Sequence, residues 1–140
     1  MKERSVRILI YGQPPRKSNS RRIVRGPSGS PRSIKSKEAL QYVESFVYHV
    51  NPEQKLGLGS KEKPLAVEGD IYYRQKFVAD LSVELVLDAL KAASVITDDR
   101  FVVWTDIRKR RDLRAPRIDL VVTELDSWDW AGKEDGDARK

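Results

Sequence analysis

The sequence of 140 residues contains no cysteine, a single histidine, and no apolar run that approaches the length of a membrane-spanning helix. Without cysteine the chain can form neither a disulfide nor a thiolate metal site, and it has no thiol nucleophile. A helix needs about 20 apolar residues to span a bilayer, and the basic start of the chain leads into a strand-like pattern rather than a signal-peptide core. These absences predict a cytoplasmic protein with no membrane partner.

Acidic residues are scarce in the first part of the chain. Residues 1–40 hold 11 Lys and Arg but only 2 acids, whereas residues 41–125 hold 13 basic and 14 acidic residues. The basic excess, which gives the chain a net charge of +6, therefore lies near the N-terminus. Such a segment attracts polyanions through phosphate contacts and the release of counterions. The other interpretation of a run of like charges is a solvated tail.

Hydrophobic periodicity predicts an α+β fold. Strand patterns alternate with amphipathic helical patterns in the order β-α-β-α-β-β. The strand patterns cover residues 5–11, 65–77, 100–107 and 117–124, and Gly69 predicts a bulge or bend in the second of them. The helical patterns cover residues 38–50, with a helix start near Ser36, and residues 81–93, with Ser94 expected to face the core. This order predicts a two-layer sandwich, in which two helices pack on a mixed sheet of about four strands.

The chain is long enough for one domain with a real core, which we place at residues 1–125. Residues 16–37 are rich in Arg, Lys, Ser, Gly and Pro and hold few large apolar residues, so we expect a mobile basic loop. Residues 126–140 have no hydrophobic period and carry more acids than bases. We expect a flexible acidic C-terminal tail there.

An acidic stripe marks the second predicted helix. Asp80, Glu84 and Asp88 recur at intervals of four and so share one helix face, and Asp98-Asp99 ends the segment. Like charges at this spacing oppose helix formation by about 0.2–0.5 kcal/mol per pair, so a partner should offset their repulsion. Mg²⁺ would do so, and arginines from basic loops would serve equally well. Taken singly, Asp80 can be a helix N-cap and Asp98-Asp99 a turn.

Together with a surface that attracts polyanions, the acids suggest metal-assisted hydrolysis of a phosphodiester, in which the metal polarises the phosphate and helps to generate hydroxide. Three groups of basic residues could position a DNA backbone by charge. These are Arg16, Lys17, Arg21 and Arg22 in the first loop, Arg74 and Lys76 beside the acidic helix, and Arg108, Arg110 and Arg111 in a predicted loop before the last strand.

Several stretches resemble the RusA family of Holliday-junction resolvases. They are "YGQPPRKSNSRR" at 11–22, "IKSKEALQYV" at 34–43, and the segment from Asp80 to Asp99, in which "LDAL" is followed by "ASVITDDRFVV". The resemblance spans residues 5–124. It implies a structure-selective endodeoxyribonuclease that uses Mg²⁺, or Mn²⁺, to cut four-way DNA junctions as a homodimer. It also implies a bacterial or phage-encoded protein.

The resemblance further implies roles for individual residues. Asp80 and Asp99 match family carboxylates, and Lys109 matches a cation that would stabilise charge on the phosphate. Lys109 is equally well explained as an ordinary phosphate contact. The residues implied to be catalytic are Asp80, Asp99 and Lys109. The expected metal ligands are Asp80, Glu84, Asp88 and Asp99.

The sequence departs from the family pattern at three positions. Val78 stands where the family has its first Asp, Leu81 replaces an Asn, and Glu84 replaces a Lys. A shift of the motif by two residues would match Asp80 and Ser82 to the family's Asp pair. That shift rotates the helix face by about 200° and would break the apolar stripe.

These departures leave two hypotheses, and a third does not depend on the resemblance. Glu84, or Asp70 at the preceding strand, could supply the missing carboxylate, so that activity survives with a rearranged site. Alternatively, the metal site is lost and the protein binds nucleic acid without cutting it. The third hypothesis is a small interaction domain whose acidic helix docks a basic partner.

Overall fold

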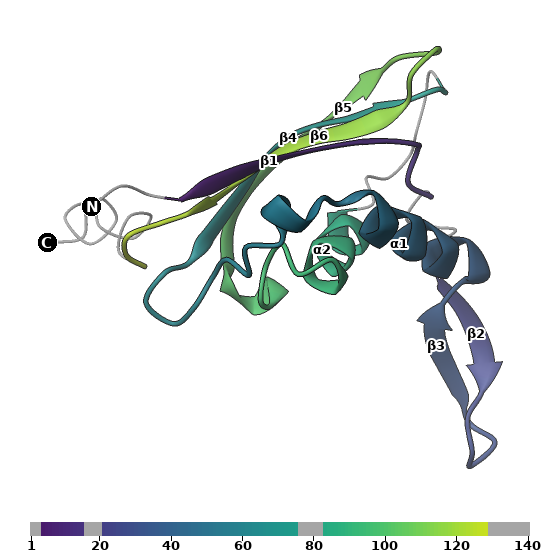
Figure 1. The fold of residues 1–140 in the computed structure, drawn as a ribbon. Helices are drawn as coiled ribbons and strands as arrows, with labels where there is room; N and C mark the ends of the chain where they lie inside the picture. Colours follow the sequence, from purple (N-terminus) through teal and green to yellow (C-terminus); the bar gives the residue numbers. More distant parts are fainter. Residues whose placement is uncertain (1–3, 16–20, 76–82, 129–140) are drawn as a thin grey trace, which may run out of the picture.

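The computed structural model describes residues 4–15, 21–75 and 83–128 of the chain (Figure 1). Eight strands and α-helices follow one another along this part of the sequence. They are β1 (Ser5–Tyr11), β2 (Arg21–Arg25), β3 (Pro31–Lys35), α1 (Lys37–His49), β4 (Leu65–Tyr73), α2 (Val83–Ala92), β5 (Val102–Arg111) and β6 (Arg117–Glu124). Two short 3-10 helices, η2 (Pro52–Gln54) and η3 (Asp99–Phe101), lie in the connections.

Four strands form one mixed sheet in the order β1-β6-β4-β5. β6 pairs antiparallel with both β1 and β4, whereas β4 and β5 run parallel. A parallel pair needs a long crossover connection, and here that connection contains α2. Both helices lie on the same face of the sheet (Figure 1). The predicted α+β sandwich, with two helices on a mixed four-stranded sheet, is confirmed.

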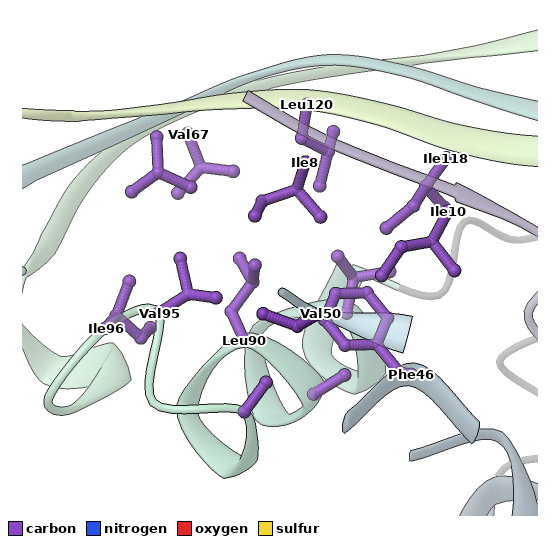
Figure 2. Close-up of a cluster of buried hydrophobic side chains, with 14 of the residues drawn as sticks. Ile8, Ile10, Phe46, Val50, Val67, Leu90, Val95, Ile96, Ile118 and Leu120 are labelled. Carbon is purple, nitrogen blue, oxygen red and sulfur yellow. The ribbon is translucent and has the colours of Figure 1, made fainter. Parts of the chain in front are cut away.

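The core fills the space between the helices and this face of the sheet. On β6 the alternation of Ile118, Leu120 and Val122 buries every second side chain, as the period of a half-buried strand requires. Figure 2 shows Ile118 and Leu120 pointing toward the helices, where Phe46 of α1 and Leu90 of α2 lie. The residues between these buried ones on β1 and β6 therefore point to the opposite face of the sheet, away from the helices.

The ends of the helices follow local chemistry. The Ser36 hydroxyl accepts a hydrogen bond from the Ala39 amide at 3.1 Å, so it caps α1 as the predicted start near Ser36 requires. α2 was expected to place Ser94 in the core. Ser94 instead lies beyond the helix end, is exposed and has a φ of 63°, while Leu85 and Ala89 supply buried side chains.

Two segments that the sequence analysis assigned to loops contain strands. β2 and β3 pair as an antiparallel hairpin, so the prediction of a loop throughout residues 16–37 is wrong for both strands. β5 continues to Arg111 because its parallel pairing with β4 extends to the pair Tyr73 and Arg111, so the basic run after Ile107 is part of a strand. The predicted mobility of the segment stays a prediction, and residues 16–20 lie outside the described residues.

The tail is described only as far as Trp128, whose indole N–H donates a hydrogen bond to the carbonyl of Lys61. The rest of the predicted flexible tail, residues 129–140, lies outside the described residues.

Glu124 is the one charged side chain that is buried within the described part of the chain, with 8% of its surface exposed. It accepts hydrogen bonds from Arg4 at 3.0 and 3.1 Å and from the Gly59 amide at 3.1 Å. The Arg4 hydrogen bond is the main cause that lowers the pKa of Glu124. A lowered folded-state pKa contributes stability above the unfolded pKa of about 4.3, and this stability is lost as pH falls through the folded pKa.

We therefore expect Glu124→Gln to lower the free energy of unfolding at pH 7 by about 1–3 kcal/mol, because the amide sets donors against the donors of Arg4 and Gly59. Urea denaturation from pH 7 to pH 3 measures this. The gap between wild type and variant should close as Glu124 becomes protonated. Asp126→Asn, which alters an exposed pair with Lys63 at 3.3 Å, is the control and should change stability by less than about 0.5 kcal/mol. A gap that persists unchanged at pH 3 would contradict the assignment.

Candidate functional site

The acidic residues predicted to act together lie along α2 and in the turn that follows it. Asp88 occupies the middle of α2, and Glu84 lies one turn before it on the exposed stripe. The chain then returns to the sheet through a short connection. In it, the Thr97 amide donates to the Leu58 carbonyl at 2.9 Å, and the Thr97 hydroxyl donates to the Gly59 carbonyl at 2.8 Å. These contacts hold the start of η3, and with it the pair Asp98-Asp99, at the C-terminal end of α2.

Asp98 and Asp99 interact directly. The Asp98 carboxylate accepts a hydrogen bond from the Arg100 amide at 3.1 Å and caps η3. This amide and a hydrogen bond from Asp99 lower the pKa of Asp98. The same hydrogen bond raises the pKa of Asp99, and so do its burial and the negative charges of Asp98 and Asp88. Neighbouring carboxyl groups oppose each other's ionisation, and a bound cation would relieve that repulsion.

Lysines approach the cluster from two sides. Lys91, on the last turn of α2, lies 3.6 Å from a carboxylate oxygen of Asp98. Lys35, the last residue of β3, lies 3.2 Å from a carboxylate oxygen of Asp88. The second contact joins the basic hairpin to the acidic helix. Lys91 follows Asp88 by three residues on the helix, and this spacing predicts that the lysine lies near the acidic stripe. Nothing in the sequence indicated the contact of Lys35 with Asp88.

The structure brings together some of the predicted site residues and separates others. Asp88 and Asp99 interact electrostatically. Lys109 does not join them in one copy of the chain: β5 is continuous from Val102 to Arg111 and advances about 3.3 Å per residue, so Lys109 lies roughly 20–25 Å from Asp99. Asp80 lies outside the described residues.

Asp70, the alternative source of a carboxylate, does not approach α2. It alternates along β4 with the buried Ile71 and therefore lies on the sheet face that the helices do not cover. There it accepts a hydrogen bond from Arg110 at 2.9 Å. The structure thus gives no support to Asp70 as a substitute ligand beside Asp99.

Within the described residues, no group of three or more His, Asp and Glu side chains is arranged to hold a metal ion. Mg²⁺ commonly takes only one or two protein carboxylates and completes its six ligands with water and substrate phosphate. Asp98 and Asp99 fit this smaller set, because they are neighbouring carboxyl groups whose mutual repulsion a cation would offset. Asp88 is near enough to add a third negative charge, whereas Glu84 lies a helix turn farther from the pair.

Several arginines of the sheet already form ion pairs with carboxylates of the same chain. Four such pairs lie on or beside the uncovered face, with N···O distances of 2.8 to 3.4 Å. They are Arg7 with Asp119, Arg108 with Asp106, Arg110 with Asp70, and Arg117 with Asp112. Two of the predicted DNA-binding residues, Arg108 and Arg110, are therefore engaged within the chain. Arg74 and Arg111 are exposed.

The hairpin differs from the sheet in this respect. Arg22, Arg25 and Arg32 are exposed, and none of them forms an ion pair with another described residue. Of the other predicted DNA-binding residues, Arg21 is described only by its place in the β2 backbone. Arg16, Lys17 and Lys76 lie outside the described residues.

The fold and these side chains define a small α+β protein in which two neighbouring carboxyl groups follow α2, the helix to which an ion pair joins the base of the basic hairpin. No protein-family model matches the chain, and no curated protein matches it. No helix in the described ranges is both long enough and apolar enough to cross a membrane.

Proposed function

We propose that the protein is a Mg²⁺-dependent, structure-selective endonuclease that cuts branched DNA such as the four-way junction, with an activity similar to that of the RusA family. The observation that carries this proposal is the ion pair of Lys35 and Asp88 at 3.2 Å. It joins the base of the basic hairpin to α2, the helix that leads to Asp98 and Asp99. A DNA backbone held by the hairpin would have a phosphate within reach of the carboxylates.

In this proposal Asp98 and Asp99 hold the metal, with Asp88 adding negative charge and Asp80 available from the preceding segment. When bound, Mg²⁺ supplies Lewis-acid polarisation of the phosphate and a water of lowered pKa. A cation binds the ionised form of Asp99, whose pKa is raised, so cutting should decline with falling pH at a higher pH than an ordinary aspartate would set. Mn²⁺ would substitute, because it accepts the same oxygen ligands.

A homodimer is part of the proposal, because two symmetric sites can nick the two matching strands of a symmetric junction. If Lys109 acts at Asp99, it would come from a second copy, since Lys109 of the same copy is a strand length away. Sedimentation of the purified protein with and without a junction would measure the stoichiometry. One copy per junction would contradict this part of the proposal.

The direct test uses a synthetic four-way junction and a linear duplex of the same sequence, each incubated with purified protein and MgCl₂ or MnCl₂. We expect cutting of the junction and little cutting of the duplex. Removal of the metal with EDTA should abolish cutting and excess Mg²⁺ should restore it, while binding measured by gel shift persists. Absence of cutting with both metals across pH 6–9 would overturn the catalytic proposal.

The second candidate function is binding of branched DNA without cutting. It is favoured by the lysine contacts of Asp88 and Asp98, which already supply positive charge to the cluster. This function predicts tight junction binding that falls steeply with salt and does not respond to Mg²⁺. An interaction domain for a basic partner, by contrast, predicts no binding to either DNA at low salt.

A further inference from the structure

The β2–β3 hairpin carries charge of one sign only. Residues 21–35 contain five Lys and Arg and no acid. The hairpin leads directly into α1, whose N-cap is Ser36. It projects away from the sheet and the helices (Figure 1). An isolated two-stranded ribbon is marginally stable in water, so a ligand that binds this one would also stabilise it.

The pairing of the two strands puts arginines on both faces of the ribbon. Opposite residues in an antiparallel pair share a face, and successive residues alternate between faces. Val24 lies opposite Arg32, so Arg32 shares its face with Arg22. Arg25, which lies opposite Pro31, is on the other face with Ile23, whose side chain is 69% exposed.

The tip of the ribbon is narrow and uncharged. Residues 26–30 read Gly-Pro-Ser-Gly-Ser, and the turn is closed by a hydrogen bond from the Gly26 amide to the Ser30 carbonyl at 2.7 Å. Gly29 has a φ of 85°, and a side chain added there would meet nothing within 4 Å. The turn therefore leaves open space at the end of the ribbon and presents no charge.

A ribbon that lay flat on a partner would need its cations on one face. Cations on both faces, with a small neutral tip, suit insertion between two lines of negative charge. The two phosphate backbones that flank a DNA groove form such lines. The major groove is about 12 Å wide and admits a two-stranded ribbon, whereas the minor groove, at about 6 Å, does not.

We propose that the β2–β3 hairpin inserts tip-first into the major groove of a duplex arm, with Arg22 and Arg32 on one phosphate backbone and Arg25 on the other. This inference rests on the proposed function, because it takes branched DNA as the ligand. It goes further because it assigns the binding of a duplex arm to the hairpin rather than to the paired arginines of the sheet. Since the contacts are to phosphates, this binding has little sequence selectivity.

The groove is tested by methylation interference on the wild-type protein bound to a four-way junction. Dimethyl sulfate methylates guanine N7 in the major groove and adenine N3 in the minor groove. We expect N7 methylation within one segment of a duplex arm to prevent binding, and N3 methylation to leave it intact. Interference from N3 alone would overturn the inference.

The hairpin's role is tested with the triple variant Arg22→Ala/Arg25→Ala/Arg32→Ala. The matched control removes the same charge from exposed residues elsewhere, with Arg7→Ala/Lys55→Ala/Lys61→Ala. We expect the hairpin variant to bind the junction roughly 10–100-fold more weakly and to reduce the slope of log K against log salt by about 2–3. The control should keep most of the affinity and most of the slope.

Two further variants measure the contribution of each face of the hairpin to DNA binding. Arg25→Ala alone and Arg22→Ala/Arg32→Ala should each reduce the salt slope, and the triple Arg→Lys variant at the same positions should restore it. An effect confined to one face would overturn insertion in favour of a flat contact. If the wild type binds the junction and the triple Ala variant binds equally well, the inference fails while the proposed function stands. If the wild type binds no DNA, both fail.

Discussion

Asp99→Asn should reduce Mg²⁺-dependent cutting of a four-way junction by at least about 100-fold, because it removes the negative charge of a proposed metal ligand while it preserves the shape of the side chain. Binding of the junction without metal should stay within about twofold, since phosphate contacts to the hairpin are unchanged. Single-turnover cutting assays and gel shifts on the same preparations measure the two quantities. Equal cutting by wild type and variant would overturn the role of Asp99.

A second readout separates the loss of a metal ligand from damage to the fold. The neighbouring Asp98 raises the pKa of Asp99, so an ionised Asp99 opposes folding at neutral pH and the Asn variant should be at least as stable as the wild type. Mg²⁺ should raise the melting temperature of the wild type and leave that of the variant unchanged, because only a bound ligand stabilises the folded state. A melting temperature that rises equally in both would place the ion elsewhere.

The matched control is Asp106→Asn, which removes one carboxylate from the uncovered sheet face. Asp106 pairs with Arg108 at 3.4 Å, and both side chains are largely exposed. The variant carries the same change in net charge as Asp99→Asn but leaves the cluster at the end of α2 intact. Cutting and metal-dependent stabilisation should therefore match those of the wild type.

The periodic elements of the fold could be predicted because burial on one side leaves its period in the sequence. β1 and β6 have the predicted bounds, and α1 begins at its predicted Ser36 cap. The strands that were missed lack such a period. β2 and β3 bury little on either face, and the end of β5 is held by backbone pairing to β4, which leaves no pattern in its basic side chains.

The candidate site was partly predictable for a related reason. Asp88 and Asp99 could be grouped because one helix and the turn after it bring them together over a short stretch of sequence. The contact of Lys35 with Asp88 joins residues far apart in the chain, and it depends on how the hairpin leaves α1. Lys109 was grouped with Asp99 by resemblance, and the prediction that its segment is a loop concealed the strand β5, along which the two residues are far apart.

Gly69→Ala should be the most destabilising single substitution in the sheet. Gly69 lies in the middle of β4, opposite Leu120 of β6 and Ile107 of β5. Its φ is 148°, and a Cβ would lie 2.1 Å from the Asp119 carbonyl oxygen and 2.8 Å from the Leu120 Cα. Both obstacles are backbone atoms of the neighbouring strand, so β6 itself would have to move. The bulge predicted at Gly69 is not present, because both pairings continue through it and the register shift lies between Leu65 and Ala66.

The expected loss for Gly69→Ala is about 3–5 kcal/mol in the free energy of unfolding, which combines backbone strain of about 1–3 kcal/mol with the cost of displacing a packed strand. Gly12→Ala is the matched control: Gly12 also has a positive φ, of 114°, but nothing lies within 4 Å of its added Cβ. It should show the strain alone, about 1–3 kcal/mol. Urea denaturation of both variants at one pH separates the two contributions. If both variants lost the same free energy of unfolding, β6 could move aside at no cost. The close approach of β4 and β6 at Gly69 would then contribute nothing to stability.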